Sequence, residues 1–259
     1  YFAERWEFLR ELKEPGLSRR AFGLDVPRLD YVLPVLVGVA LVLLFFFLQK
    51  DLGPALVVAC LFLSLYGVAR GRATMVVVGL ALLVAGFAAG YALDFPRTVV
   101  GRVQMWASPW NNAVRGGDQL AHSFWALSTG GITGTGLGLG DPALVPAAHT
   151  DLVLAALGEE LGLVGVALAF GLLAFIAWRA LRVAQRASGD YGFFLALGLA
   201  LGIVLPFLLI AGGLLGVLPL TGVATPFLSY GRSSMIANLA SVGILLAITP
   251  LFFPIVMQA

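Results

Sequence analysis

Charged residues are scarce in this chain of 259 residues. Asp, Glu, Lys and Arg together make up 12% of it, whereas a soluble domain carries about 25%. Hydrophobic residues make up 60% of the chain. Because so few charges cannot give a surface of this size enough polar groups, the composition excludes a water-soluble domain and predicts an integral membrane protein.

Cysteine is almost absent as well. The single cysteine, Cys60, lies inside an apolar run, so no disulfide framework exists and cysteine does not indicate the redox compartment. The net charge of +2 is too small to point to a partner.

Long apolar runs take the place of the missing charges. They are roughly 17 to 25 residues long, the length that a helix needs to cross a bilayer. Because backbone groups that face lipid must be hydrogen-bonded within their own segment, the runs predict an all-α polytopic bundle. Six transmembrane helices are expected, at 31–48, 52–69, 74–93, 151–178, 191–211 and 232–250.

The remaining segments complete the expected organisation. Residues 1–30 are basic and amphipathic and are expected to form a cytoplasmic loop, with no nucleic acid as a partner. Three helices follow in 31–94, a large extracellular loop with one short helix dipping toward the membrane in 95–150, and three more helices in 151–259. A Gly/Pro-rich, re-entrant-like loop is expected at 212–231. Since Tyr1 is no initiator methionine and no signal peptide follows, we expect the chain to begin within a longer protein.

The basic residues predict which ends of the helices face outward. With 1–30 in the cytoplasm, eleven Lys and Arg residues fall inside and five outside, as the positive-inside bias requires. The outer five are Lys50, Arg97, Arg102, Arg115 and Arg232. The long loop, the 212–231 loop and the Lys50-Asp51 turn are therefore expected on one outer face.

Asp151 opens the fourth predicted helix, after a glycine-rich segment and His149-Thr150. In one interpretation Thr150 is the N-cap and Asp151 the first helical residue, favoured there by the helix dipole. In the other, an ionised Asp151 at an apolar mouth accepts a proton from a hydroxyl or holds a divalent cation. The glycine run is no dinucleotide fingerprint, because no strand precedes it.

Two further groups of polar residues have alternative interpretations. Glu159 and Glu160 lie roughly 12 Å beyond Asp151 on an ideal helix and do not share its face, so they form either a buried structural network or a proton relay or substrate contact. The outer basic residues either pair with the loop acids Asp94, Asp118 and Asp141, or Arg232 joins the hydroxyls of 229–234 in an anion site at a helix start.

Several motifs, in this order and covering nearly the whole chain from Gln49 onward, resemble the SEDS family of RodA and FtsW. They are Gln49-Lys50-Asp51-Leu52-Gly53, Arg102 with Trp106 and Pro109, Ser128-Thr129-Gly130-Gly131 with Gly134-Thr135-Gly136-Leu137-Gly138, His149-Thr150-Asp151, Glu159-Glu160-Leu161-Gly162, Leu218-Pro219-Leu220-Thr221-Gly222 and Pro226-Phe227-Leu228-Ser229-Tyr230-Gly231. The resemblance implies a bundle of ten helices, of which this chain looks like the last six. Two positions depart from the common pattern, Arg232 in place of glycine and Thr135 in place of lysine.

The resemblance implies a peptidoglycan glycosyltransferase of the bacterial cytoplasmic membrane, acting in cell shape or division. It would polymerise lipid II at the outer face, release undecaprenyl pyrophosphate, and work with a class B penicillin-binding protein and other members of the cell-wall synthesis complex. Asp151 would be its essential acid, deprotonating or orienting the acceptor hydroxyl directly or through a divalent cation, Mg²⁺ or Mn²⁺. Lys50, Arg102 and Arg232 are candidates to stabilise the leaving group. The full set of substrate-binding candidates is Lys50, Asp51, Arg102, Gln119, His149, Thr150, Ser229, Arg232, Ser233 and Ser234.

Two other function classes stay open from the sequence alone. A flippase or transporter of lipid-linked precursors also suits an apolar bundle with buried carboxylates. A non-catalytic scaffold for the penicillin-binding protein would leave Asp151 dispensable. Asp151 therefore discriminates among the three.

Overall fold

The computed structural model describes residues 2–11, 18–21, 24–27, 29–71, 73–110, 119–141 and 144–249. Lys13, Arg28, Arg72, Arg115 and Asp118, which the sequence assigns to one side of the membrane or the other, lie outside these ranges. The elements are α1 (Phe2–Glu11), β1 (Ser18–Ala21), β2 (Leu24–Pro27), α2 (Leu29–Leu48), α3 (Leu52–Arg70), α4 (Thr74–Ala92), α5 (Arg97–Ala107), α6 (Gln119–Gly130), α7 (Val153–Arg186), α8 (Gly189–Leu214) and α9 (Arg232–Ile248).

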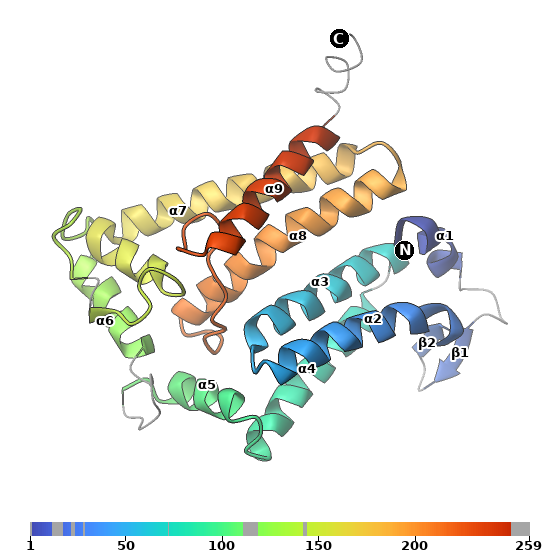
Figure 1. Ribbon diagram of the computed structural model, residues 1–259, viewed down its shortest axis with the longest axis horizontal. Helices are drawn as coiled ribbons and strands as arrows, with labels where there is room; N and C mark the ends of the chain where they lie inside the picture. The colour runs from blue at the N-terminus through green and yellow to red at the C-terminus, as the bar shows by residue number, and fades with distance from the viewer. Residues whose placement is uncertain are drawn as a thin grey trace, which may run out of the picture.

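The long helices form a bundle with two groups (Figure 1). In one group, α7 and α8 pack side by side and α9 lies across them; in the other, α3 packs against α2 and α4. The groups meet where α3 contacts α8. Local sequence sets these helix ends: Gly71 closes α3 in the left-handed region, with φ of 66°, where its N–H bonds the carbonyls of Gly67 and Val68.

A helix occupies each of the six stretches that the sequence predicts as spans, and the all-α fold class is confirmed. By length and composition, α3, α7 and α8 can cross a membrane, so the protein is a multi-pass membrane protein. Val76–Ala92 and Arg97–Ala107, bent by 95°, pass the same test together as one broken span. Among the described residues α9 and Val37–Phe46 of α2 are shorter apolar helices, so the count of six spans stays a prediction.

The N-terminal stretch is more ordered than the predicted loop. It contains α1 and an antiparallel hairpin of β1 and β2. The ring of Phe2 lies 6.0 Å from that of Phe194 on α8 and 5.9 Å from that of Phe62 on α3. Because α1 packs aromatic side chains against two helices of the bundle, it is part of the bundle.

The prediction of one continuous helix from 151 to 178 is wrong, because α7 breaks at Gly162, whose φ of 67° and ψ of −167° are not helical. The segment after α6 fills the break. Its N–H groups at Thr135 and Gly136 donate to the carbonyls of Glu159 and Glu160, both at 3.0 Å. Its carbonyls at Gly131 and Ile132 accept from the N–H groups of Leu163 and Val164, at 2.9 and 3.2 Å. The loop thus replaces the hydrogen bonds that the break removes from the helix.

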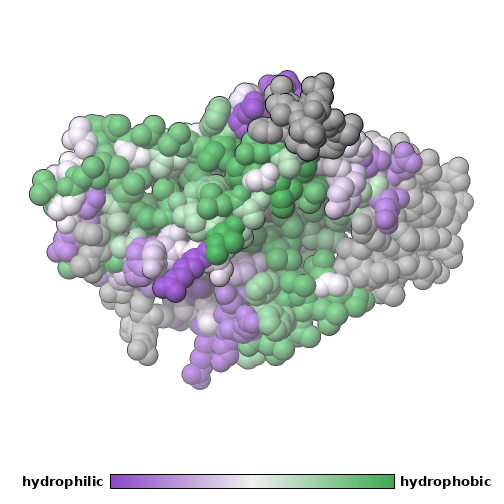
Figure 2. Space-filling model, turned by 45° about the horizontal axis from the view of Figure 1, so that its top comes forward, coloured by the Kyte–Doolittle hydropathy of each residue, from purple (hydrophilic) through white to green (hydrophobic). Residues whose placement is uncertain are grey.

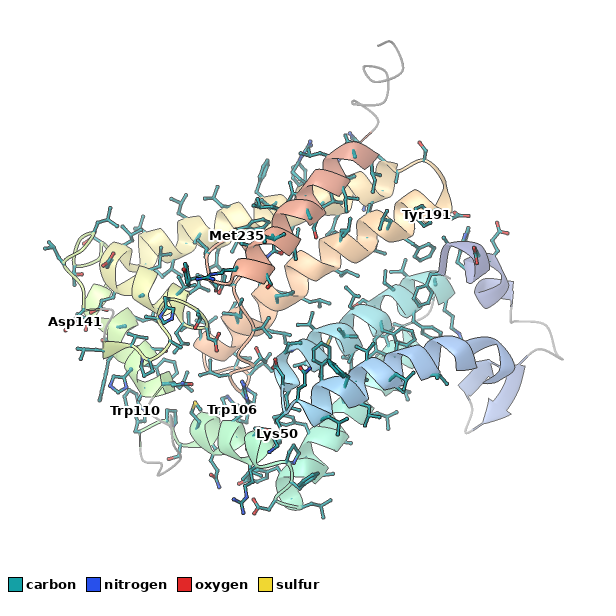
Figure 3. The ribbon with its side chains drawn as sticks, in the orientation of Figure 1. Lys50, Trp106, Trp110, Asp141, Tyr191 and Met235 are labelled. Atoms are coloured by element: carbon teal, nitrogen blue, oxygen red, sulfur yellow. The ribbon has the colours of Figure 1, made fainter. Side chains whose placement is uncertain are left out.

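The polar connections gather at two opposite ends of the bundle (Figures 1 and 3). One end carries the α2–α3 turn with Lys50, α5, α6 and the segments that precede α7 and α9. The other end carries α1, the hairpin and the α7–α8 connection near Tyr191. Figure 2 shows broad apolar surfaces separated by a hydrophilic strip. The three polar features that the sequence assigns to one face do share one end.

Candidate active site

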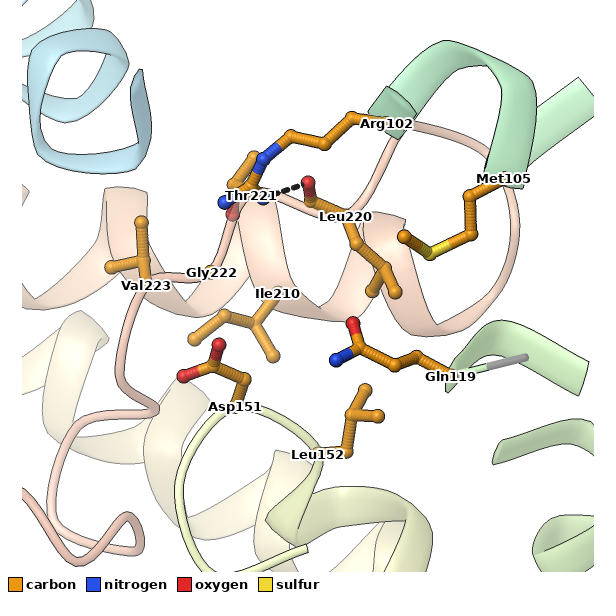
Figure 4. A pocket seen from close by; sticks show the side chains of 10 residues that line it. All are labelled: Arg102, Met105, Gln119, Asp151, Leu152, Ile210, Leu220, Thr221, Gly222 and Val223. Carbon is orange, nitrogen blue, oxygen red and sulfur yellow. Dashed lines mark hydrogen bonds between the residues drawn. The ribbon is translucent and has the colours of Figure 1, made fainter. Parts of the chain in front are cut away.

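A cavity of about 210 Å³ opens at the end that carries α5 and α6 (Figure 4). It lies where four parts of the chain that are separate in sequence meet: α5, the start of α6, the turn before α7, and the end of α8 with the loop that follows it. Its lining residues are Arg102, Met105, Gln119, Asp151, Leu152, Ile210, Leu220, Thr221, Gly222 and Val223. Three predicted site residues, Arg102, Gln119 and Asp151, are among them.

Two side chains of α5 hold the loop after α8 in place. The Arg102 guanidinium donates from Nη1 to the Leu220 carbonyl, the bond drawn in Figure 4. One turn along α5, Nε1 of Trp106 donates to the Gly216 carbonyl at 2.7 Å. The loop therefore passes over the cavity as a fixed wall, and Arg102 is anchored with its charge inside the cavity.

Gly222 of that loop lies between Arg102 and Asp151. A Cβ added there would lie 2.8 Å from Nη2 of Arg102 and 3.4 Å from Oδ2 of Asp151. Its φ of +68° is in the left-handed region, which favours glycine. Because Gly222 has no side chain, the Arg102 guanidinium and the Asp151 carboxylate can both lie close to its backbone.

The capping interpretation of Asp151 is wrong. Helix α7 begins only at Val153, its N-cap is Leu152, and no side chain caps it. The Thr150 hydroxyl donates instead to the Ala147 carbonyl at 3.3 Å. Asp151 belongs to the turn before the helix, and among the residues that the structure describes none donates a hydrogen bond to its carboxylate. This half-buried carboxylate is therefore free to receive a proton or a hydroxyl from a substrate.

Ser229 fixes the turn that carries Asp151. Its hydroxyl donates to the Thr150 carbonyl at 2.5 Å and accepts from the Thr225 N–H at 2.7 Å. The N–H of Tyr230 donates to the His149 carbonyl at 2.8 Å. Ser229 is buried and its hydroxyl bonds two backbone groups, so it positions this turn, and the substrate contact predicted for it stays a prediction.

Burial and nearby charges act together on Asp151. Burial raises the pKa of its carboxyl above the ordinary range, and the negative charge of Asp51 raises it further. The positive charge of Arg102 opposes burial most strongly, and His149 adds a smaller lowering contribution to this pKa. A carboxylate with a raised pKa is a stronger base than an exposed one.

The α2–α3 turn reaches the rim of the site. Gly53, in the first turn of α3, packs so closely on the backbone of Thr221 that an added Cβ would overlap the Thr221 carbonyl oxygen. This contact places Asp51 near enough to act on Asp151. Lys50, its exposed neighbour in the turn, has a φ of 59°. The Thr221 hydroxyl oxygen is buried and has no hydrogen-bond partner among the described residues.

Glu159 and Glu160 lie at the α7 break rather than at the cavity. Glu159 is buried, and its Oε1 accepts from the Asp141 N–H at 3.2 Å, while its Oε2 has no partner among the described residues. The Thr135 hydroxyl donates to the Glu159 carbonyl at 3.1 Å. This geometry favours the buried structural network over a relay to Asp151.

Arg232, Ser233 and Ser234 form the first turn of α9 and do not line the cavity. Ser234 accepts a hydrogen bond from Nδ2 of Asn238 at 3.2 Å. Arg232 is exposed. A phosphate contact in this turn stays a prediction.

Several lining residues were not predicted. Met105, Leu152, Ile210 and Val223 supply apolar walls, and Gly222 and Thr221 supply the close backbone approach. The only sequence signal for the last two was the Pro219–Gly222 motif in the predicted loop. That motif indicated a turn, but nothing in it indicated that the turn lies against Asp151.

A resident metal would have few protein ligands. In the described part of the chain no group of three or more His, Cys, Asp or Glu side chains is arranged to hold a metal ion. Mg²⁺ is often held by one or two carboxylates, with waters and substrate phosphates completing its shell. Asp151, with Asp51 nearby, fits only a cation of this kind.

Comparison with known proteins adds evidence from outside this chain. The FtsW/RodA/SpoVE family model, described as a cell cycle protein, matches residues 22–250. Over 232 residues the chain is 38% identical to the peptidoglycan glycosyltransferase RodA of Mycobacterium leprae, covering 90% of this chain and 50% of that protein. It is 35% identical over 220 residues to a probable peptidoglycan glycosyltransferase FtsW of Geobacter sulfurreducens, covering 84% of this chain and 58% of the relative.

A solved structure is similar too. It comes from work on the structural coordination of polymerization and crosslinking by a peptidoglycan synthase complex, and it matches with a TM-score of 0.67 at 26% identity. The match covers 95% of this chain and 78% of the other. The chain spans about half the length of the RodA relatives it matches.

Proposed function

The chain belongs to the FtsW/RodA/SpoVE family, as its motifs predicted, and from that membership we propose that it contributes the catalytic site of a peptidoglycan glycosyltransferase. The substrate would be lipid II, both as the donor of the growing glycan and as the acceptor. The observation that carries the proposal is the Asp151 carboxylate: half-buried, without a donor among the described residues, and next to a fixed arginine in a cavity. The names of the relatives supply the reaction class.

Asp151 acts as the base in this proposal. The acceptor's 4-hydroxyl oxygen attacks the anomeric carbon of the donor, and the bond from that carbon to the pyrophosphate oxygen breaks. Asp151 takes the hydroxyl proton and later releases it to water. Its raised pKa suits this role, because a weakly basic carboxylate would take the proton less readily.

Arg102 stabilises the charge of the departing undecaprenyl pyrophosphate. Its guanidinium is already held by Leu220, so little reorganisation is needed as the charge develops. Lys50 and Arg232 stay candidates for the outer phosphate. Should Mg²⁺ or Mn²⁺ take part, Asp151 would be its ligand, and the ion would supply further positive charge for the leaving group.

The assembly and orientation are proposed with the activity. The cavity end faces outward from the bacterial cytoplasmic membrane, as the distribution of Lys and Arg indicates. The similar chain from the peptidoglycan synthase complex supports a class B penicillin-binding protein as the partner that cross-links the product.

The test is polymerisation of labelled lipid II by the purified full-length protein with its partner. Asp151→Asn and Asp151→Ala should abolish glycan chains while lipid II binding and thermal stability persist. Undiminished chains in both variants would refute the assignment. Lipid movement across vesicles without polymerisation would favour the transporter class instead.

A further inference from the structure

We propose that the glycine loop, residues 131–141, seats its apolar tip in the interfacial region of the lipid leaflet on the cavity side. The tip carries Ile132, Leu137 and Leu139, with exposed fractions of 70%, 75% and 77%. Large apolar side chains this exposed on an ordered loop indicate a contact surface. The neighbouring helix α7 indicates that this surface contacts the lipid bilayer.

The loop continues the lipid-facing stripe of α7. Beyond the break, α7 exposes Leu163, Val164, Leu168, Leu172 and Phe175. Only 17% of its most apolar window is buried among the described residues, and we assign the exposed apolar side of this span-length helix to lipid. The Ile132 carbonyl bonds the Val164 N–H at 3.2 Å, so the loop begins where the stripe ends. In Figure 2 the apolar surface runs to the left-hand end, where Figure 1 places the segment after α6.

The length of α7 places the loop at the edge of the hydrocarbon core. Arg182 lies over the ring of Trp178 at 5.0 Å, a pair typical of a membrane interface. From Arg182 to Leu163 the helix rises about 28 Å, against a core of about 30 Å. The break therefore lies at the opposite boundary, and Leu137 and Leu139 belong to the interface beyond it.

The loop backbone suits an environment with little water. The Gly134 N–H donates to the Gly130 carbonyl at 2.8 Å, and the Leu139 N–H donates to the Gly136 carbonyl at 3.1 Å. With the four bonds across the α7 break, much of the loop backbone is paired internally, as a position near lipid requires. The loop leads into the turn that carries Asp151. Insertion of the loop tip into the lipid interface would therefore hold the cavity at the level of the lipid headgroups.

The experiment measures depth by spin-label accessibility, without substrate, so its outcome is independent of the proposed transferase activity. Leu137→Cys is labelled in the full-length protein with its other cysteines, including Cys60, replaced, in vesicles of phosphatidylethanolamine and phosphatidylglycerol. Leu168→Cys on the α7 stripe is the lipid reference, and Ser188→Cys in the α7–α8 connection is the aqueous reference. For each label we take the ratio of its accessibility to oxygen over its accessibility to a water-soluble nickel chelate. We expect this ratio at position 137 to lie several-fold above that at position 188 and close to that at position 168.

Two results would overturn the proposal. A ratio at Leu137 equal to that at Ser188 would place the tip in water. Shielding from both reagents that appears only when the partner protein is added would make the tip a protein-docking surface instead. Leu139→Cys, labelled in the same way, repeats the measurement if one label disturbs the loop.

Discussion

Replacing Gly222 by alanine should separate catalysis from folding. The new Cβ would lie 2.8 Å from Nη2 of Arg102, so the guanidinium would have to move by about 0.6 Å to reach an ordinary contact of 3.4 Å. That movement weakens its bond to Leu220 and shifts the cation relative to Asp151. Misplacement of a catalytic group by about 1 Å can cost about 100-fold, so we expect the polymerisation rate to fall by about 10- to 100-fold.

Gly189→Ala, at the opposite end of the bundle, is the matched control for this substitution. Its φ of +75° is close to that of Gly222, and an added Cβ there would meet no atom within 4 Å. Both variants pay a similar backbone cost of about 1–2 kcal/mol for alanine in the left-handed region. Thermal stability and the rate of glycan formation from labelled lipid II, measured on the full-length protein, compare the two. An equal loss of activity in both variants would refute the reasoning, because strain alone would then explain the effect.

Three further variants test the supports of the site. Ser229→Ala should lower the free energy of unfolding by about 1–3 kcal/mol, because the buried Thr225 N–H and the part-buried Thr150 carbonyl lose their partner, and should lower activity with it. Asp51→Asn should move the acidic limb of the pH–rate profile to lower pH, because removing this negative charge lowers the pKa of Asp151, and the base form then persists to lower pH. Gly134→Ala should destabilise far more than Gly131→Ala, because the first Cβ would overlap the Glu160 carbonyl and the second meets open space.

Each of these three predictions is checked by a control variant or by an outcome that would contradict it. Ser241→Ala removes an exposed hydroxyl that bonds only the Ala237 carbonyl, and it should change stability by less than about 0.5 kcal/mol. An unmoved acidic limb in Asp51→Asn, with full activity at neutral pH, would mean that Asp151 is not the titrating base. Equal melting temperatures of the Gly134 and Gly131 variants would mean that the glycine loop is not locked into the α7 break.

The sequence predicted the family, the six apolar helices and Asp151 as the residue to test. Hydropathy is a local property, so runs such as 52–69 and 74–93 match α3 and α4 almost residue by residue. The gathering of the Lys50-Asp51 turn, the long loop and the 212–231 loop at one end also followed from counting spans, because each crossing reverses the direction of the chain.

Only the tertiary structure showed what the local pattern could not contain. Gly162 lies inside the run that the sequence predicts as a single helix, and the helix breaks there because a loop some thirty residues earlier supplies the replacement hydrogen bonds. Thr150-Asp151 has the pattern of an ordinary helix start. In the structure it is a turn held by Ser229, which lies 79 residues further along the chain.

The sequence by itself therefore determined the membrane fold and the chemical groups available to the site. The lengths of the apolar runs and the types of the residues can both be read directly from the chain. The tertiary structure alone decided which groups meet at Asp151, because Arg102, Gly222 and Asp51 approach it through backbone contacts between distant segments. The periodicity of hydrophobic residues does not predict such contacts, because they depend on where a loop crosses a helix in space.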